Sequence, residues 1–177
     1  NTSSTPTPPP IPTPTTEPIS DNTIPGKIEA EDYTAMYGID TEGCSEGTLN
    51  VGWTNAGDWM DYNVNVQSAG QYTVEFRVAA QDPTGTLELR KGGTVLGSVI
   101  PPNTGGWQAW TTVSTTVNLS QGQQTLRVYL TGGNVNINWI NFTTSSSTPT
   151  PTSTPAPTGW TLVWSDEFDG TSLDTGK

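Results

Sequence analysis

Two tryptophans stand in turn-rich stretches, where a large apolar ring has little protein around it to pack against. Trp53 lies in the Gly- and Asn-rich stretch 50–58, and Trp107 directly follows the similar stretch 103–106. An indole in a turn is costly to leave in water unless protein or a ligand covers it. The two rings therefore predict either a ligand-binding surface or two residues that pack at the rim of the fold.

Two acidic residues near the start of the chain are candidate metal ligands. Glu29 and Glu31 flank Ala30, so both side chains fall on the same face of an extended strand. Like carboxylates this close repel unless a cation neutralises them, and the chain has only 6 Lys and Arg residues. A Ca²⁺ ion, which prefers oxygen ligands, would neutralise them. The alternative is a pair of solvated carboxylates at a sheet edge.

Composition excludes several other functions. Cys44 is the single cysteine and the chain has no His, so we expect a small packed residue there rather than a disulfide or an activated nucleophile. A net charge of −11 leaves no basic surface for nucleic acid. No apolar run is long enough to span a membrane. The 7 Trp residues and few Lys residues are typical of an extracellular protein that binds a polar ligand.

The residues that position these side chains form one domain between two linkers. Residues 1–24 and 145–158 consist mainly of Thr, Ser and Pro, a composition that buries little apolar surface and favours extended, disordered spacers. They frame residues 25–144, which have the length of an ordinary single domain. Residues 159–177 are too few to fold alone and are predicted to be the first strand and turn of a further domain.

Apolar and polar residues alternate through residues 25–144, in runs separated by turns that contain Gly, Pro, Asn or Asp. Period-two alternation is typical of strands with one face toward a core. About nine short strands without disulfides predict an all-β fold, a β-sandwich of the jelly-roll type. The predicted inward-facing residues include Met60, Tyr62, Val64, Val66, Tyr72, Val74, Phe76, Val78, Leu87, Leu89, Val113, Val117, Leu119, Leu126, Val128 and Leu130.

A set of short motifs in residues 25–144 resembles a family 6 carbohydrate-binding module. The motifs keep the order and approximate spacing of that family. The resemblance implies a galactose-binding-like β-jelly roll that binds sugar without catalysis. The motifs are Ile28-Glu29-Ala30-Glu31-Asp32-Tyr33, Thr41-Glu42-Gly43, Asn50-Val51-Gly52-Trp53, Gly57-Asp58-Trp59, Asn103-Thr104-Gly105-Gly106-Trp107-Gln108 and Gly132-Gly133-Asn134-Val135-Asn136-Ile137-Asn138-Trp139.

The resemblance implies a sugar clamp at one end of the sandwich. Trp53 and Trp107 match loop aromatics that hold a sugar ring between their faces, where covering roughly 100 Å² of apolar surface contributes on the order of 2 kcal/mol. Asn136 matches an Asn that offers one acceptor and two donors to sugar hydroxyls, and Glu42 matches an acid in the same cleft. The alternatives are an Asn on the polar face of the last strand and a solvated loop carboxylate.

The resemblance also implies a second sugar site and a structural metal ion. Trp59 and Glu88 have the parity opposite to the core residues of their strands, and they match residues that form a second site on the concave sheet face in some members. The alternative is a Trp covered by loops beside an ordinary surface Glu. Glu29 and Glu31 match ligands of a structural Ca²⁺, and Asn138 matches a third ligand that is Asp in many relatives.

Residues 162–170 resemble the start of a family 16 glycoside hydrolase of the laminarinase type. Glu167 and Asp169 match none of that family's catalytic positions, and a glycosidase needs two carboxylates at a controlled separation. The sequence thus predicts a monomeric, non-catalytic module that targets a secreted, extracellular β-glucanase to polysaccharide, with β-1,3-glucan (laminarin) as the ligand. The alternatives are xylan, cellulose or mixed-linkage β-glucan as the ligand, a catalytic glycosidase fragment, and an adhesive sandwich with both rings buried against protein.

Overall fold

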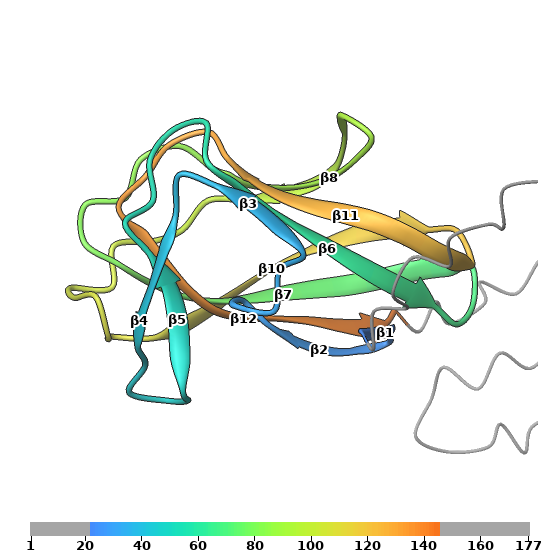
Figure 1. The fold of residues 1–177 in the computed structure, drawn as a ribbon, viewed down its shortest axis with the longest axis horizontal. Coiled ribbons are helices and arrows are strands. Elements are labelled where there is room, and N and C mark those ends of the chain that lie inside the picture. Colours follow the sequence, from blue (N-terminus) through green and yellow to red (C-terminus); the bar gives the residue numbers. More distant parts are fainter. Residues whose placement is uncertain (1–21, 146–177) are drawn as a thin grey trace, which may run out of the picture. The chain divides into compact units, whose positions relative to one another are not determined.

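A computed structural model describes residues 22–145, which form a sandwich of two β-sheets (Figure 1). The predicted all-β fold is confirmed, and the described residues contain no helix. Within these residues there is accordingly no helix of the length and apolarity needed to cross a membrane. Residues 1–21 and 146–177 lie outside the described part, and with them lie most of both predicted linkers and the predicted start of a further domain.

The first sheet has the strand order β1-β6-β11-β8-β9, and β3 also pairs with β6. The pairs β6–β11, β11–β8 and β8–β9 are antiparallel, whereas β1 runs parallel to the last residues of β6. The strands of this sheet are β1 (Thr23–Ile24), β3 (Ala35–Tyr37), β6 (Trp59–Val66), β8 (Leu87–Lys91), β9 (Thr94–Val99) and β11 (Gly122–Leu130).

The second sheet has the strand order β10-β7-β12-β5-β4, and β2 also pairs with β12. The pairing of β12 with β7 shifts register between Ile137 and Trp139, which makes a bulge at Asn138. The strands of this sheet are β2 (Gly26–Glu29), β4 (Asp40–Gly43), β5 (Leu49–Gly52), β7 (Gly70–Ala80), β10 (Thr111–Leu119) and β12 (Val135–Thr144).

The core lies between the sheets and consists of the inward-facing residues of both. All of the predicted inward-facing residues are buried except Val113, which is partly buried and packs against the core. Tyr62 is fully buried, and its hydroxyl donates a hydrogen bond to the carbonyl oxygen of Ala30 over 2.6 Å. Burial raises the pKa of Tyr62 well above its ordinary value. The alternation in the sequence therefore identified the core correctly.

The structure has more strands than predicted, and it gives two residues of the predicted linkers, Ile24 and Ser145, contacts with the sandwich. There are twelve strands among the described residues rather than about nine, because short edge strands such as β1, β3 and β4 have too few residues for an alternation to show. Ile24, predicted to lie in a linker, is fully buried in the core. Ser145, also predicted to lie in a linker, donates from its backbone N–H to the carbonyl oxygen of Gln71 over 2.9 Å.

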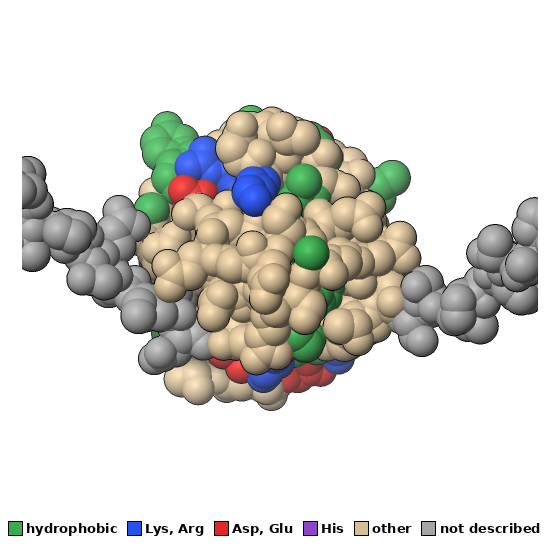
Figure 2. Space-filling model, turned by 90° about the vertical axis from the view of Figure 1, so that its right-hand side faces the viewer, with side chains coloured by type: hydrophobic (Ala, Val, Ile, Leu, Met, Phe, Trp, Pro, Cys, Tyr) green, Lys and Arg blue, Asp and Glu red, His purple; other side chains and the backbone are tan. Residues whose placement is uncertain are grey.

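The two ends of the described part reach the same turn, between β6 and β7. The backbone N–H of Gln67 donates to the carbonyl oxygen of Ile24 over 2.9 Å, and Ser145 reaches Gln71 at the start of β7. The β5–β6 and β9–β10 loops, which carry Trp53 and Trp107, lie at the opposite end of the sandwich (Figure 1). Figure 2 shows the end where the turn lies, on which most side chains are uncharged and polar.

Candidate functional site

A hollow of about 530 Å³ lies at the end of the sandwich where the β5–β6 and β9–β10 loops meet. It brings together all four residues predicted to bind sugar, from four separate segments. Trp53 comes from the β5–β6 loop, Trp107 from the β9–β10 loop, Asn136 from β12 and Glu42 from β4. The hollow is also lined by Thr54, Asn55 and Asn134.

Trp53 is held in a backbone conformation that is rare for a residue with a side chain. Its φ of 53° lies in the left-handed region, and 59% of the residue is exposed. Such a conformation costs on the order of 1–3 kcal/mol and persists only where neighbouring contacts impose it. The Thr54 hydroxyl donates to the Val135 carbonyl oxygen over 2.7 Å and accepts from the Val135 N–H over 3.1 Å. Gly133 permits this contact, because a Cβ there would lie 2.3 Å from the Thr54 carbonyl oxygen.

Trp107 is 42% exposed, and its loop is fixed to the sheet at two points. The Thr104 hydroxyl accepts from the Ala80 N–H over 2.8 Å, and Asn136 Nδ2 donates to the Trp107 carbonyl oxygen over 2.9 Å. Both indole rings are therefore held at the surface of the hollow. The alternative in which protein of the same module buries both rings is wrong for the described residues.

Glu42 provides the acidic part of the floor of the hollow. Its Oε1 accepts from three amide groups, Asn136 Nδ2 at 2.6 Å, Asn50 Nδ2 at 3.3 Å and Gln108 Nε2 at 3.4 Å. Its Oε2 accepts no hydrogen bond from any residue between 22 and 145. One carboxylate oxygen of Glu42 thus joins β12, β5 and the β9–β10 loop, and the other accepts no hydrogen bond from the described residues.

Asn136 differs from its predicted role. It is 3% exposed, and its Nδ2 donates to both Glu42 and the Trp107 carbonyl oxygen, so both N–H groups are used within the protein. The remaining Oδ1 lies beside Gly52, where an added Cβ would be 3.0 Å away. The prediction that Asn136 offers two donors to a ligand is therefore wrong, because the protein consumes both. Asn136 offers an acceptor only.

Sequence reasoning missed two further residues that hydrogen-bond to Glu42 from outside the lining of the hollow. Asn50 is fully buried, and its Oδ1 accepts from Gln108 Nε2 over 2.9 Å. Gln108 Oε1 in turn accepts from the Ser45 N–H over 2.8 Å. These contacts join β5 to the β9–β10 loop and the β4–β5 turn, so no pattern within one segment reveals them. The only local signal is that Gln108 directly follows Trp107 and that Asn50 precedes Trp53 by three residues.

Trp59 and Glu88, the predicted second site, share the outer face of the first sheet. Tyr129 lies between them, because it pairs with Trp59 on β6 and with Glu88 on β8. The guanidinium of Arg127 lies 3.7 Å from the Trp59 ring centre, and that of Arg90 lies 3.6 Å from the Tyr129 ring centre. The two predicted residues are thus brought to one surface, where an arginine covers one face of the Trp59 ring.

Glu31 and Asn138, two of the three predicted metal ligands, each have one buried oxygen atom without a hydrogen-bond partner among the described residues. The two atoms are Glu31 Oε2 and Asn138 Oδ1. The bulge in β12 directs Asn138 inward, where it is 1% exposed. Burial, and the nearby charges of Glu29 and Asp32, raise the pKa of Glu31 above its ordinary value. Buried oxygens without donors are the ligands that Ca²⁺ prefers, so these two atoms fit the predicted ion.

Glu29, the third predicted ligand, has a partner already. Its Oε1 lies 2.5 Å from Lys27 Nζ, and its side chain is 39% exposed. One of the few cations in the chain, Lys27, thus pairs with Glu29 from two residues earlier on the same strand. Between residues 22 and 145, no three Asp, Glu, His or Cys side chains gather closely enough to hold a metal ion by themselves.

The turn between β4 and β5 is fastened to both the floor and the second sheet. Arg77 on β7 donates to both carboxylate oxygens of Glu46, over 2.8 and 2.6 Å, and lowers the pKa of that carboxyl. Trp110 Nε1 donates to Ser45 Oγ over 3.0 Å. Cys44 is a free, partly buried thiol whose Sγ accepts from the Glu46 N–H over 3.4 Å. The predicted structural role of Cys44 agrees with this position in the turn.

Three solved structures of isolated modules are similar to this chain. The C-terminal module of the laminarinase LamC from Zobellia galactanivorans is 48% identical with a TM-score of 0.63, over 66% of this chain and 97% of that one. A β-1,3-glucan-binding module from Bacillus halodurans is 40% identical with a TM-score of 0.64, over 68% and 97%. A module of Cellvibrio mixtus lichenase 5A, in complex with cellotriose, is 39% identical with a TM-score of 0.65, over 68% and 98%.

The family assignment follows from the whole sandwich. The chain spans between 10% and 24% of the length of the curated relatives that it matches, so it corresponds to one module of each. Residues 29–144 match the family model described as carbohydrate binding module (family 6). The chain therefore belongs to the family 6 carbohydrate-binding modules and is a non-catalytic domain of the kind that binds polysaccharide.

Proposed function

We propose that this module binds a β-glucan at the hollow, with one sugar ring between Trp53 and Trp107. The observation that carries the proposal is the meeting of two exposed indoles and an available carboxylate oxygen in one hollow. The indole faces would cover the apolar faces of a pyranose, while Glu42 and Asn136 would accept hydrogen bonds from its hydroxyl groups. Two rings on one sugar would also exclude water from these polar contacts.

We infer β-1,3-glucan as the ligand. The similar module from Bacillus halodurans binds β-1,3-glucan, and the similar module from Zobellia galactanivorans belongs to a laminarinase. The module from Cellvibrio mixtus holds cellotriose, which makes cellulose or mixed-linkage β-glucan the second candidate. Xylan is the third ligand that the sequence resemblance implies. In the whole protein, the module would tether a secreted polysaccharide hydrolase and raise the local concentration of its substrate.

The hollow does not have the groups of a glycosidase. Glycoside hydrolysis uses two carboxyl groups on either side of the bond that is cut. Glu42 is the one acidic side chain among the residues that line this hollow. The proposed role is therefore binding, and hydrolysis would have to come from another part of the whole protein.

Calorimetry tests the proposal directly. We expect the full 177-residue chain to bind laminari-oligosaccharides more tightly than oligomers of xylan, cellulose, lichenan or agarose. Trp53→Ala and Trp107→Ala each remove about 2 kcal/mol of stacking, which corresponds to roughly thirtyfold weaker binding. Unchanged affinity in both variants would sink the assignment of the clamp.

Trp59→Ala is the matched control, because it removes the same side chain from the outer face of the first sheet. If only the clamp binds, this variant keeps the affinity of the parent and a stoichiometry of one sugar chain per module. If the predicted second site also binds, the stoichiometry of the parent is higher and Trp59→Ala reduces it to one. The Arg127 guanidinium on the Trp59 ring leaves that site only the other face of the ring for stacking.

We further propose that Glu31 and Asn138 hold a structural Ca²⁺ ion. Their two buried oxygens without donors support the site, and the ion would neutralise the charge of Glu31. Glu29 would become a third ligand only if its carboxylate left the ion pair with Lys27 and bound the Ca²⁺ ion instead. The proposed ion would lie beside the second sheet, and its role would be to stabilise the fold. It would not contact the sugar.

A further inference from the structure

We propose that the hollow also takes a protonated amino sugar, with the ammonium group bound by Glu42 Oε2 and flanked by the Trp53 and Trp107 rings. This inference rests on the proposed function, because it uses the same clamp. It adds a positively charged class of ligand. A site that binds only neutral glucan would not bind a cationic sugar more tightly than a neutral one. Three features of the hollow support it: its charge, the orientation of its polar groups and its aromatic walls.

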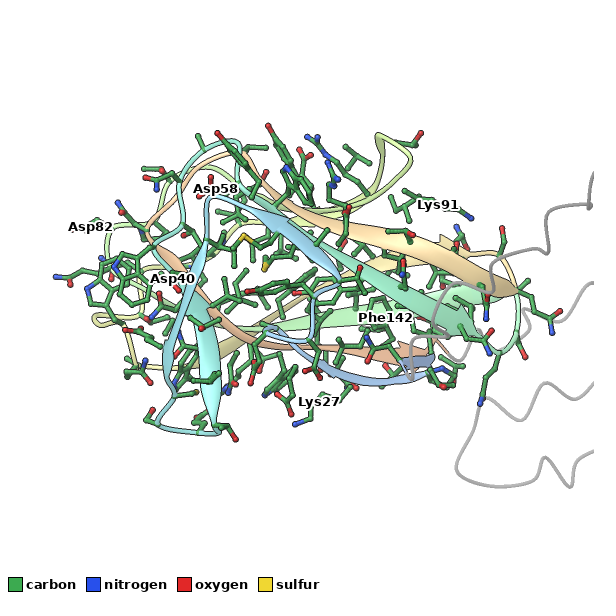
Figure 3. The ribbon with its side chains drawn as sticks, in the orientation of Figure 1. Lys27, Asp40, Asp58, Asp82, Lys91 and Phe142 are labelled. Atoms are coloured by element: carbon green, nitrogen blue, oxygen red, sulfur yellow. The ribbon has the colours of Figure 1, made fainter. Side chains whose placement is uncertain are left out.

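The charge around the hollow is negative. Glu42 is the one ionisable side chain that lines it, and no Lys or Arg does. Asp40, Asp58 and Asp82 lie at the same end of the sandwich, whereas Lys91 lies at the other end (Figure 3). The other basic side chains between residues 22 and 145 are all in ion pairs with acids, namely Lys27 with Glu29, Arg77 with Glu46, Arg90 with Glu88 and Arg127 with Asp61. The hollow therefore attracts a cation and repels an anion.

The three amide side chains around Glu42 donate their hydrogen bonds within the protein. Asn136, Asn50 and Gln108 all direct their side-chain N–H groups into the protein, onto Glu42, backbone carbonyls or each other. Glu42 Oε2 and Asn136 Oδ1 accept no hydrogen bond from the described residues, and both residues line the hollow. Asn55 and Asn134 also line it and each donate one hydrogen bond to a backbone carbonyl, so the donor for Glu42 Oε2 has to come from the ligand. A hydroxyl brings one donor, whereas an ammonium group brings three together with a positive charge.

The two indoles add to the attraction of a cation. A cation within about 6 Å of an indole face is attracted by the ring's electron density, and a hydrogen bond from an ammonium to a carboxylate is roughly twice as strong as a neutral one. A uronate or sulfated sugar would instead bring a negative charge and more acceptors to the same floor. The expected order of affinity is amino sugar, then neutral sugar, then acidic sugar.

Three trimers with the same β-1,4 linkage isolate the effect of the amine. Cellotriose is neutral, the N-acetylglucosamine trimer is neutral with an amide, and the glucosamine trimer is cationic when protonated. An amine beside electron-withdrawing oxygens titrates near the value of a protein α-amino group, about 7.7. We expect calorimetry on the full chain at pH about 6 to show the glucosamine trimer binding about tenfold more tightly than both neutral trimers. At pH about 9 this advantage disappears, while cellotriose binds equally at both values.

Two substitutions separate a bound ammonium from general attraction to an acidic surface. Glu42→Gln keeps the size of the side chain and is expected to remove the tenfold advantage. Asp40→Asn removes a charge at the same end from a side chain that lies outside the hollow, and it is expected to keep the advantage. Loss of the advantage in Asp40→Asn, or its retention in Glu42→Gln, would overturn the proposal.

Competition identifies the site. Laminaritriose is expected to displace the glucosamine trimer, and Trp53→Ala and Trp107→Ala are expected to weaken both ligands. If neutral glucans bind the clamp and the glucosamine trimer binds no more tightly than cellotriose, the inference fails and the proposed function stands. If no neutral glucan binds or the tryptophan variants bind as the parent does, the proposed function fails as well.

Discussion

The Thr54 hydroxyl both donates to and accepts from the backbone of Val135. This pair of hydrogen bonds anchors the chain directly after Trp53, so we expect Thr54 to position the Trp53 ring. Thr54→Val keeps the shape of the side chain and leaves the Val135 N–H and carbonyl oxygen without these partners. Buried groups that lose a partner cost about 1–3 kcal/mol. We expect the free energy of unfolding to fall by this amount and the affinity for sugar to fall as well, because Trp53 relaxes from its left-handed conformation.

Thr54→Ser is the control for this change. It keeps the hydroxyl and is expected to restore the affinity of the parent in calorimetry, even where urea denaturation shows a small loss of stability. Equal affinities for the Val and Ser variants would show that Thr54 contributes to folding alone and does not position Trp53.

The residues of the clamp could be predicted from the sequence. The hydrogen bonds that their individual atoms make within the protein could not. Trp53 and Trp107 stand in recognisable turns, Glu42 and Asn136 stand in strands within recognisable motifs, and the structure brings all four to one hollow. Which N–H of an amide meets which oxygen depends on neighbours from other loops. Asn136 was therefore assigned donors that Glu42 and the Trp107 carbonyl oxygen already use.

At the scale of elements, an ion pair is one of the contacts that hold the turn between β4 and β5. Arg77 lowers the pKa of Glu46, so the carboxylate is favoured in the folded state. A carboxyl whose folded pKa lies below its unfolded pKa contributes stability above the unfolded value, and this contribution is lost as the pH falls through the folded pKa. The pair is therefore expected to weaken in acid, below the ordinary Glu value of about 4.3.

Glu46→Gln measures this contribution. Because the Glu46 side chain is 38% exposed, solvent screens the pair, and we expect the variant to lose no more than about 1 kcal/mol of unfolding free energy at pH about 7. As the pH falls through the folded pKa of Glu46, the difference between the variant and the parent is expected to shrink toward zero. Urea denaturation at low salt across this range gives the difference, and a difference that persists in acid would contradict the assignment.

The bulge in β12 is the element that supports the proposed Ca²⁺ ion. Addition of Ca²⁺ is expected to raise the melting temperature and EDTA to lower it, since an ion present at 100 times its dissociation constant stabilises the folded state by about 2.7 kcal/mol. Asn138→Asp adds a charge to the ligand set and is expected to reach the same shift at lower Ca²⁺ concentration. Glu31→Gln is expected to abolish the shift, and a Ca²⁺ response that survives in it would place the ion elsewhere.

The long strands could be predicted from alternation, but the bulge and the short edge strands could not. β6 and β7 have enough residues for period two to appear, and their buried faces are those expected. In β12 the four residues Val135 to Asn138 are all buried. Asn138 lies at the bulge, and Asn136 is covered by Glu42 and the Trp107 loop, so alternation is lost there. Strands of two to four residues, such as β1, carry no period at all.

At the scale of the molecule, Ile24 shows that the module begins earlier than its composition indicates. It is fully buried beside the end of β6, although the Thr- and Pro-rich stretch before it has the composition of a linker. Ile24→Ala in the full chain is expected to lower the free energy of unfolding by about 2–5 kcal/mol. Thr23→Ala, at the exposed neighbouring position, is the control and is expected to change it by less than about 0.5 kcal/mol. Equal effects of the two changes would contradict a structural role for β1.

Both ends of the described part reach the β6–β7 turn, while the hollow lies at the other end of the sandwich. This arrangement makes the module suited to transplantation. Inserted into a surface loop of an unrelated protein, it would need only two neighbouring attachment points, and neither of its sheets would have to be cut. The β5–β6 and β9–β10 loops could meanwhile be varied in a library, because their sequences have no part in how the module is attached to its host.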